Sequence, residues 1–313
     1  MNLKLRKPPF PFSAAPTPAT VEPLSGKKHT GIDYETEWAR SFPARLARLA
    51  VLEGVLRPTM KVIASPDCRG LDRLHDLAGK RRSNEPPQPV IFAANHHSHV
   101  DTPLLLSSIP EPWRHRMFVG AAADYFFKTR VTSTASALAL NAIPIERTRV
   151  SRRSADDAAD LIDDGWSMLI YPEGGRSPDG WGQPFRGGAA YLALRCNVPV
   201  VPVHLEGTGR IMRKGSKRLT RSATRITFGP PLWPDRDAGD DSRRMAVRIE
   251  RAVAALADEA STDWYTARLR AHRDATPALS GPDPPSPWRR AWALGDRGPK
   301  RRRASKRRWP DLG

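Results

Sequence analysis

Three histidines and an aspartate lie within seven residues, 95–101, whose sequence is NHHSHVD. On a continuous helix, five residues advance about 500°, so the side chains of His96 and Asp101 would point about 140° apart. The two can meet only if the chain turns between them, which a junction of strand and helix allows. An aspartate that accepts from one imidazole nitrogen leaves the other nitrogen available as a base. The pair therefore predicts general base catalysis by His96.

The same segment has two other interpretations. Asp101 suits the N-cap of a following helix, with the histidines as ordinary loop residues. His97, His99 and Asp101 also form HxHxD, the opening of the ligand motif of metallo-β-lactamases, and imidazole and carboxylate groups suit zinc. That motif continues with a histidine where this chain has Thr102. A metal-dependent hydrolase stays open as an alternative, although we expect no metal site.

A second cluster of functional residue types spans residues 171–177, whose sequence is YPEGGRS. Two glycines separate Glu173 from Arg176, and glycine lets the backbone approach a ligand closely. A guanidinium group forms paired hydrogen bonds with a phosphate group. The cluster thus fits a phosphate site, and taken alone it fits a salt-bridged turn equally well.

Both clusters follow short apolar runs, and such runs alternate with helix-like segments along the chain. This alternation predicts an α/β fold, a single layered domain with a largely parallel or mixed central sheet flanked by helices. The expected strands are 90–95, 116–120, 142–145, 167–171, 198–205 and 224–229. The expected helices are 101–108, 132–140, 154–164, 187–195 and 242–259.

A further helix is expected ahead of this unit, over residues 42–63. Pro58 should kink or end it. On one face, Glu53, Arg57 and Lys61 follow at a spacing of four. The apolar stripe on another face suits packing against the body of the protein or contact with a membrane surface. The stripe comprises Leu49, Leu52, Leu56 and Met60.

The formal net charge of +18 is concentrated at the chain ends. Residues 1–31 carry +4 and many prolines, and residues 286–313 carry +8. We expect 1–31 to be a disordered segment, 32–275 to fold, and 276–313 to be a proline-rich linker with a disordered basic tail. Basic tails suit anionic partners. A nucleic-acid-binding protein that uses the arginine-rich tail is therefore a second alternative, although the motifs lie in the body.

The composition also bears on the compartment. Two cysteines, Cys68 and Cys196, do not make a disulfide scaffold and suit a reducing environment. No apolar stretch approaches the roughly 20 residues that cross a bilayer, and the basic start of the chain lacks the apolar core of a signal peptide. We expect a cytoplasmic protein.

Four motifs occur in the order found in the glycerophosphate and lysophosphatidic acid acyltransferase family. The family signatures are NHxSxxD, a middle motif that ends in arginine, (F/Y)PEGxRS and a late strand that contains proline. This chain resembles them with NHHSHVD at 95–101, IPIER at 143–147, YPEGGRS at 171–177 and VPVVPV at 198–203. The resemblance covers roughly residues 88–232, the motif core of the expected acyltransferase domain. Gly175 stands where the family usually has threonine, which bears on the choice of acceptor.

The resemblance implies transfer of a fatty acyl group from an acyl thioester, acyl-CoA or acyl carrier protein, without a cofactor. The acceptor would be a hydroxyl of a glycerophosphate, most readily 1-acyl-sn-glycerol 3-phosphate, which gives phosphatidic acid. The implied base is His96, oriented by Asp101. Asn95 and Ser98 would have supporting roles. The implied substrate-binding residues are Arg147, Glu173, Gly174 and Arg176.

A lipid acceptor requires contact with a membrane surface. The tail interleaves three tryptophans with arginines, and each basic residue contributes about 1 kcal/mol near an anionic surface. We therefore expect peripheral attachment to anionic membranes, with the helix around residues 49–60 as a second contact. The tryptophans are Trp288, Trp292 and Trp309.

Overall fold

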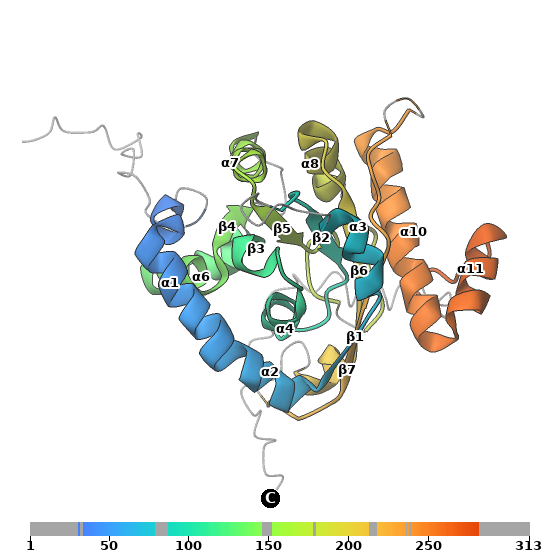
Figure 1. Cartoon of the computed structure of the whole chain (residues 1–313), viewed down its shortest axis with the longest axis horizontal. Helices are drawn as coiled ribbons and strands as arrows, with labels where there is room; N and C mark the ends of the chain where they lie inside the picture. Colours follow the sequence, from blue (N-terminus) through green and yellow to red (C-terminus); the bar gives the residue numbers. More distant parts are fainter. Residues whose placement is uncertain are drawn as a thin grey trace, which may run out of the picture.

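A computed structural model of the chain describes residues 31, 34–78, 87–145, 152–177, 180–212, 218–235, 237 and 239–281. These residues form a seven-stranded sheet between helices, which confirms the predicted fold class (Figure 1). The strand order is β1-β7-β6-β2-β5-β3-β4. The β6 and β7 strands pair antiparallel, and every other neighbouring pair is parallel.

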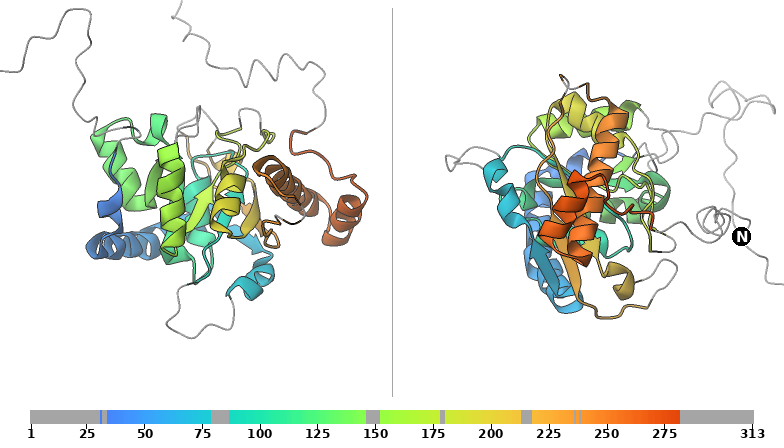
Figure 2. Two further views of the ribbon diagram at one scale, coloured as in Figure 1. Left: turned by 90° about the horizontal axis from the view of Figure 1, so that it is seen from above. Right: turned by 90° about the vertical axis from the view of Figure 1, so that its right-hand side faces the viewer.

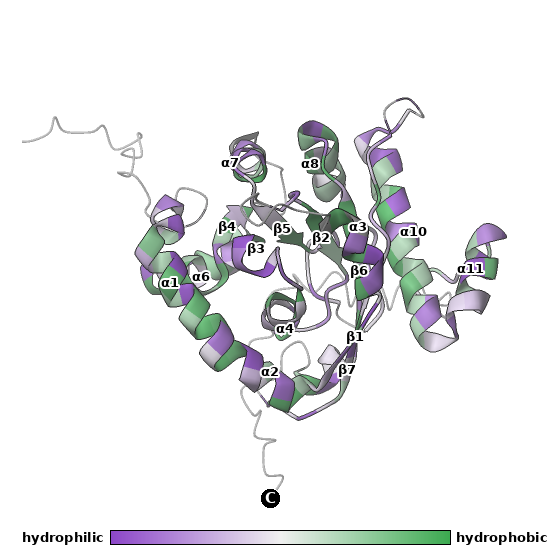
Figure 3. Ribbon diagram, viewed as in Figure 1, coloured by the Kyte–Doolittle hydropathy of each residue, from purple (hydrophilic) through white to green (hydrophobic). Residues whose placement is uncertain are grey.

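The six expected strands are present, and a seventh joins the sheet edge. The strands are β1 Pro66–Arg69, β2 Ile91–Ala94, β3 Met117–Ala122, β4 Ala142–Ile145, β5 Ser167–Ile170, β6 Val200–Glu206 and β7 Thr224–Phe228. The central strand β2 has the sequence IFAA and is buried along its whole length. Figure 3 shows it as apolar throughout, as a strand covered on both faces requires.

Helices lie on both faces of the sheet. On one face, α2 and α4 pack on Phe92, Val201 and Phe228. On the other face, α7, α8 and α10 pack on Ile91 and Met168. The longer helices are α1 Phe42–Val51, α2 Arg57–Ala64, α4 Asp101–Ser108, α6 Arg130–Leu140, α7 Arg152–Asp163, α8 Gly188–Cys196, α10 Ser242–Ser261 and α11 Trp264–His272. The short helices are α3 His75–Ala78, α5 Ala123–Phe126 and α9 Thr208–Ile211.

The helical segment that begins at Phe42 does not end at Pro58. It runs through α1, a π-helical stretch at Leu52–Leu56, and α2. A proline ring normally clashes with the carbonyl four residues earlier, which here belongs to Gly54. The π-helical turn widens the helix just before that ring, so the helix continues to Ala64.

The apolar stripe of this helix packs against the body except at Leu49, which is 43% exposed. Leu52 and Met60 are buried in the core, and Leu56 packs against the same cluster. Glu53, on the other face, forms ion pairs with Arg57 and Arg114. Figure 2 shows α1 at one side of the molecule and α10 with α11 at the opposite side. No helix among the described residues is long and apolar enough to span a bilayer.

Candidate active site

The candidate site lies at the carboxyl ends of β2 and β5, the edge at which parallel sheets commonly bind ligands. The chain leaves β2 at Ala94, turns through residues 95–100, and enters α4 at Asp101. This turn brings His96 and Asp101 together, with 2.8 Å between His96 Nδ1 and Asp101 Oδ2. The junction of strand and helix that the spacing required is therefore present.

Asp101 is fully buried and orients the turn around it. Its Oδ2 also accepts hydrogen bonds from the backbone N–H groups of His97, at 2.7 Å, and Ser98, at 2.8 Å. Since Oδ2 already acts as an acceptor for these two N–H groups, we assign the proton of its hydrogen bond with His96 to Nδ1 of the ring. The His96 Nε2 is then the nitrogen that can take a proton.

A tyrosine supports the His96 ring from the side. The rings of His96 and Tyr171 stack with centroids 4.1 Å apart and planes inclined by 17°. The Tyr171 hydroxyl lies 3.0 Å from Thr102 Oγ1, at the start of α4. Burial raises the pKa of the Tyr171 phenol well above its ordinary value, so it stays protonated. Tyr171 thus links the end of β5 to the helix that carries Asp101.

Glu173 joins the two motif loops through backbone hydrogen bonds. One carboxyl oxygen accepts from His96 N at 2.8 Å, and the other accepts from Gln183 N at 3.0 Å. The carboxyl group is buried, and this burial raises the pKa of Glu173 to about 7. In this structure Glu173 positions the backbone on both sides of the site.

The two supporting residues hold the turn against the rest of the fold. Asn95 pairs with the backbone of Leu205 in β6 through both its amide oxygen, at 2.7 Å, and its amide nitrogen, at 2.9 Å. The Ser98 hydroxyl donates to Met212 O at 2.8 Å. Its proton is thus committed to a carbonyl, which does not suit a nucleophile.

The glycine and arginine of the second cluster shape the other side of the site. Gly174 has a φ of +71°, and a Cβ there would lie 2.9 Å from Nε of Arg186, so the Arg186 side chain lies directly against it. Arg176 lies near His99; burial, together with the charge of Arg176, lowers the pKa of that histidine. The predicted substrate-binding Arg147 falls outside the described residues.

The metal-ligand interpretation gains no support from the geometry. His99 Nε2 is hydrogen-bonded to Tyr125 OH at 3.0 Å, and the two rings stack. Within the described part of the chain, the ligand atoms of His97, His99 and Asp101 do not gather within 4.8 Å of one another. The one described group that does consists of Glu53, Glu111 and His115, where Arg114 already pairs with both carboxylates.

Comparison with known proteins agrees with this geometry. The Acyltransferase family model matches residues 72–206, which include both motif loops. The match spans less than half of the chain, so it shows that this part of the chain is similar to the family. The matching region carries NHHSHVD and YPEGGRS, the segments that meet at the carboxyl ends of β2 and β5.

Two curated proteins are similar to about half of this chain. The chloroplastic 1-acyl-sn-glycerol-3-phosphate acyltransferase BAT2 of Brassica napus is 31% identical over 50% of this chain and 45% of its own length. The human 1-acyl-sn-glycerol-3-phosphate acyltransferase alpha is 26% identical over 57% of this chain and 62% of its own length. The chain thus spans roughly half the length of the curated relatives that it matches.

A solved structure shares the fold. It is the 1-acyl-sn-glycerophosphate (LPA) acyltransferase PlsC of Thermotoga maritima, 21% identical, with a TM-score of 0.54. The likeness covers 73% of this chain and 86% of that chain. At 21% identity, this likeness shows the shared fold and says nothing about the substrates of this chain.

Proposed function

We propose that the protein is an O-acyltransferase that moves a fatty acyl group from an acyl thioester to 1-acyl-sn-glycerol 3-phosphate. The product would be phosphatidic acid. The observation that carries this proposal is the hydrogen bond between His96 and the buried Asp101, next to a loop that carries Arg176. The names of the relatives support the same reaction, since both are 1-acyl-sn-glycerol-3-phosphate acyltransferases.

The reaction requires one proton transfer in each direction. His96 Nε2 takes the proton of the acceptor hydroxyl while its oxygen attacks the thioester carbonyl. The new C–O bond forms, the C–S bond breaks, and the imidazolium returns the proton to the departing sulfur. Asp101 stabilises the positive charge that His96 carries in between. A positioned base of this kind contributes about 10²- to 10⁴-fold to the rate.

The acceptor phosphate would bind on the Arg176 side of the site. A guanidinium forms paired hydrogen bonds with phosphate oxygens, and Arg147 would add a second one. Gly174 belongs to the same loop, and its φ of +71° is a backbone conformation that favours glycine. A lysolipid with its phosphate held there would present its free hydroxyl to His96.

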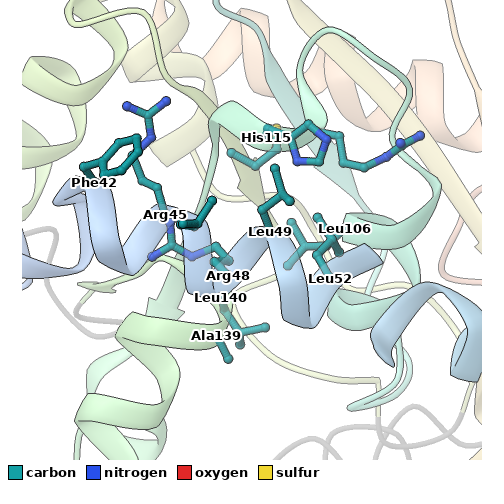
Figure 4. Close-up of a pocket in the computed structure, with 12 residues that line it drawn as sticks. Phe42, Arg45, Arg48, Leu49, Leu52, Leu106, His115, Ala139 and Leu140 are labelled. Carbon is teal, nitrogen blue, oxygen red and sulfur yellow. The ribbon is translucent and has the colours of Figure 1, made fainter. Parts of the chain in front are cut away.

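We also propose that the protein contacts an anionic membrane surface peripherally from the cytoplasm. A cleft of about 240 Å3 lies beside α1, and Figure 4 shows Arg45 near its leucines. Arg48 also lines the cleft, but its guanidinium donates to backbone carbonyls of the fold. Phe42 is 75% exposed on the same helix, and Val55 in the next turns is 61% exposed. Exposed apolar side chains beside arginines suit the interface of an anionic bilayer. The basic tail, which falls outside the described residues, would be the second contact.

A product measurement tests the proposed reaction. The purified protein is incubated with one acyl-CoA or one acyl carrier protein thioester, and with glycerol 3-phosphate, 1-acyl-sn-glycerol 3-phosphate and other lysophospholipids in parallel. We expect the mass of phosphatidic acid to appear from 1-acyl-sn-glycerol 3-phosphate. Release of free fatty acid with no acylated product would contradict the proposal and favour a hydrolase.

A further inference from the structure

A short segment a few residues after α11, residues 277–281, lies against the loop that carries the second motif; we call it the strap. It lies outside the region that matches the family model, which ends at residue 206. A turn shapes the end of the strap, because Gly281 N donates to Ala278 O at 3.0 Å and Gly281 has a φ of +73°. The proposed reaction does not yet give this segment a role.

The strap is fastened to residues 181 and 182, which come shortly after the YPEGGRS motif in the sequence. Gly182 N donates to Leu279 O at 2.9 Å. Gly182 is buried, and a Cβ added to it would lie only 2.8 Å from Leu279 Cβ. The Trp181 indole lies against Gly281, where an added Cβ would be 2.4 Å from the ring. Glycine at both positions therefore allows the two segments to touch.

The next residue, Gln183, connects this contact to the motif loop. Its backbone N–H donates to the Glu173 carboxyl group at 3.0 Å, and the other oxygen of that group accepts from His96 N at 2.8 Å. Its side-chain Nε2 lies 3.3 Å from Arg176 O and 3.5 Å from Gly175 O, and donates to both. Gln183 thus holds the backbone that carries Arg176.

The loop has extra backbone freedom at Gly175. The motif resembles (F/Y)PEGxRS, in which threonine is usual at this position, and glycine has more conformations to lose than threonine. Movement at Gly175 would displace the neighbouring Arg176, and fixing the loop when a ligand binds would cost conformational entropy. The hydrogen bonds from the Gln183 side chain to the carbonyls of both residues oppose this movement.

Arg176 needs a defined position to bind a phosphate group. It is half-buried, near His99. Paired hydrogen bonds with phosphate oxygens require the planar guanidinium to approach in one orientation. A residue on a loop keeps such an orientation when neighbouring groups hold its backbone. Gln183 and the strap supply groups of this kind.

We propose that the strap, acting through Gln183, positions Arg176 for the phosphate of the acceptor. The inference rests on the proposed function, and it adds a segment beyond the family match to the construction of the site. Gln183 and the strap are positioning residues, since they act through the backbone of Arg176. With the guanidinium held in place before the acceptor arrives, binding costs less conformational entropy.

Gln183→Leu tests the positioning residue. The substitution removes the side-chain donors and keeps the backbone N–H that reaches Glu173. We expect the KM for 1-acyl-sn-glycerol 3-phosphate to rise about three- to tenfold, as the loss of one net hydrogen bond implies. The donor KM should stay unchanged, because Gln183 does not line the neighbouring cleft that the strap helps to form. An unchanged acceptor KM, or an equal rise of both KM values, would overturn the proposal.

The same substitution in a Gly175→Thr background tests the restraint itself. Threonine limits the backbone at position 175 without help from Gln183. We therefore expect Gln183→Leu to raise the acceptor KM less in this background than in the native protein. An equal rise in the two backgrounds would contradict the proposed role of Gln183.

Gly281→Ala tests the strap in the full-length protein. The added Cβ meets the Trp181 ring, so the contact between the strap and residue 181 must shift. We expect the acceptor KM to rise about threefold or more. Gly31→Ala is the matched control, because Gly31 has a φ of +75° and a Cβ there meets nothing within 4 Å. Equal acceptor KM values in the two variants would contradict the proposal.

The double variant shows whether the strap acts through Gln183. If both changes release the same group, Gly281→Ala together with Gln183→Leu should raise the acceptor KM little more than the larger single effect. A rise equal to the product of the two single effects would show independent action and would overturn the proposed route.

Direct binding separates this inference from the proposed reaction. 1-Acyl-sn-glycerol 3-phosphate and sn-glycerol 3-phosphate are each titrated into the native protein, Gln183→Leu and Gly281→Ala. We expect both variants to bind them more weakly. If this is observed but the native protein forms no phosphatidic acid, the proposed function fails and the positioning role stands. Equal affinities in all three proteins would overturn the positioning role alone, and a native protein that binds neither ligand would contradict both.

Discussion

At the residue scale, Glu173 makes the stability of the protein depend on pH. Its folded pKa of about 7 lies above its ordinary value of 4.5. Between these values the unfolded chain loses its proton and the folded protein keeps it, so the free energy of unfolding falls as pH rises from 4.5 to 7. Compared with the Glu173→Gln variant, we expect the native protein to lose about 3 kcal/mol of its free energy of unfolding between pH 4.5 and pH 7.

Denaturant unfolding of both proteins at a series of pH values measures this difference. Above pH 7 the two curves should run parallel, because the carboxyl group is then ionised in both states. If the native protein instead loses stability relative to Glu173→Gln as the pH falls below 4.5, the pKa of Glu173 is lowered in the folded protein. That result would contradict this account of its environment.

Arg176 should govern use of the acceptor. In Arg176→Ala the phosphate loses a charged hydrogen-bonding partner, so we expect the KM for 1-acyl-sn-glycerol 3-phosphate to rise by roughly tenfold or more. The donor KM should change little. Arg251→Ala is a matched control, because Arg251 is 75% exposed on α10, outside the site. An effect confined to the donor KM would reverse the proposed division of the two substrate sides.

The sequence predicted some residues of the site better than others. The pairing of His96 with Asp101 follows from their spacing across one local turn, and the structure contains that turn. Tyr171 and Thr102 are 69 positions apart in the sequence, so their contact could not be predicted from local spacing. The position of Tyr171 directly after β5, beside the strand that ends at the catalytic turn, is the signal that could have found it.

At the element scale, the segment of α1 and α2 is held by its buried face. Leu52 is buried in the core, whereas Val55 is 61% exposed. We expect Leu52→Ala to lower the free energy of unfolding by about 2–4 kcal/mol, because it removes buried methyl groups and leaves a cavity. Val55→Ala, the control on the same helix, should change it by about 0.5 kcal/mol or less. Equal effects in denaturant unfolding would contradict the packing described here.

The elements that were not predicted from the sequence are those without a clear local pattern of apolar residues. The β1 strand has the sequence PDCR and alternates half-buried with exposed positions at a sheet edge, so it lacks an apolar run. In α11 only Ala267 is buried, and no apolar stripe marks the helix. The α6 helix starts two residues before the predicted helix. Thr129 and Thr132 form a capping box at this earlier start, and the sequence analysis did not predict it.

At the scale of the whole molecule, two anchors are proposed for membrane contact. We expect the protein to sediment with vesicles that contain anionic lipid, and to be released by salt, because the attraction of basic residues is screened. Deletion of residues 286–313 should reduce this binding and largely preserve transfer to a detergent-dispersed acceptor. Unchanged vesicle binding after the deletion would exclude the tail as an anchor and leave α1 as the candidate.

The central claim is that His96, oriented by Asp101, is the base in an acyl transfer to 1-acyl-sn-glycerol 3-phosphate. The most direct test compares the initial rate of phosphatidic acid formation by the native protein, His96→Ala and Asp101→Asn, each with a circular dichroism spectrum to check folding. We expect both variants to fold and the His96→Ala rate to fall by about 10²- to 10⁴-fold. A folded His96→Ala protein with a rate close to that of the native protein would contradict the claim.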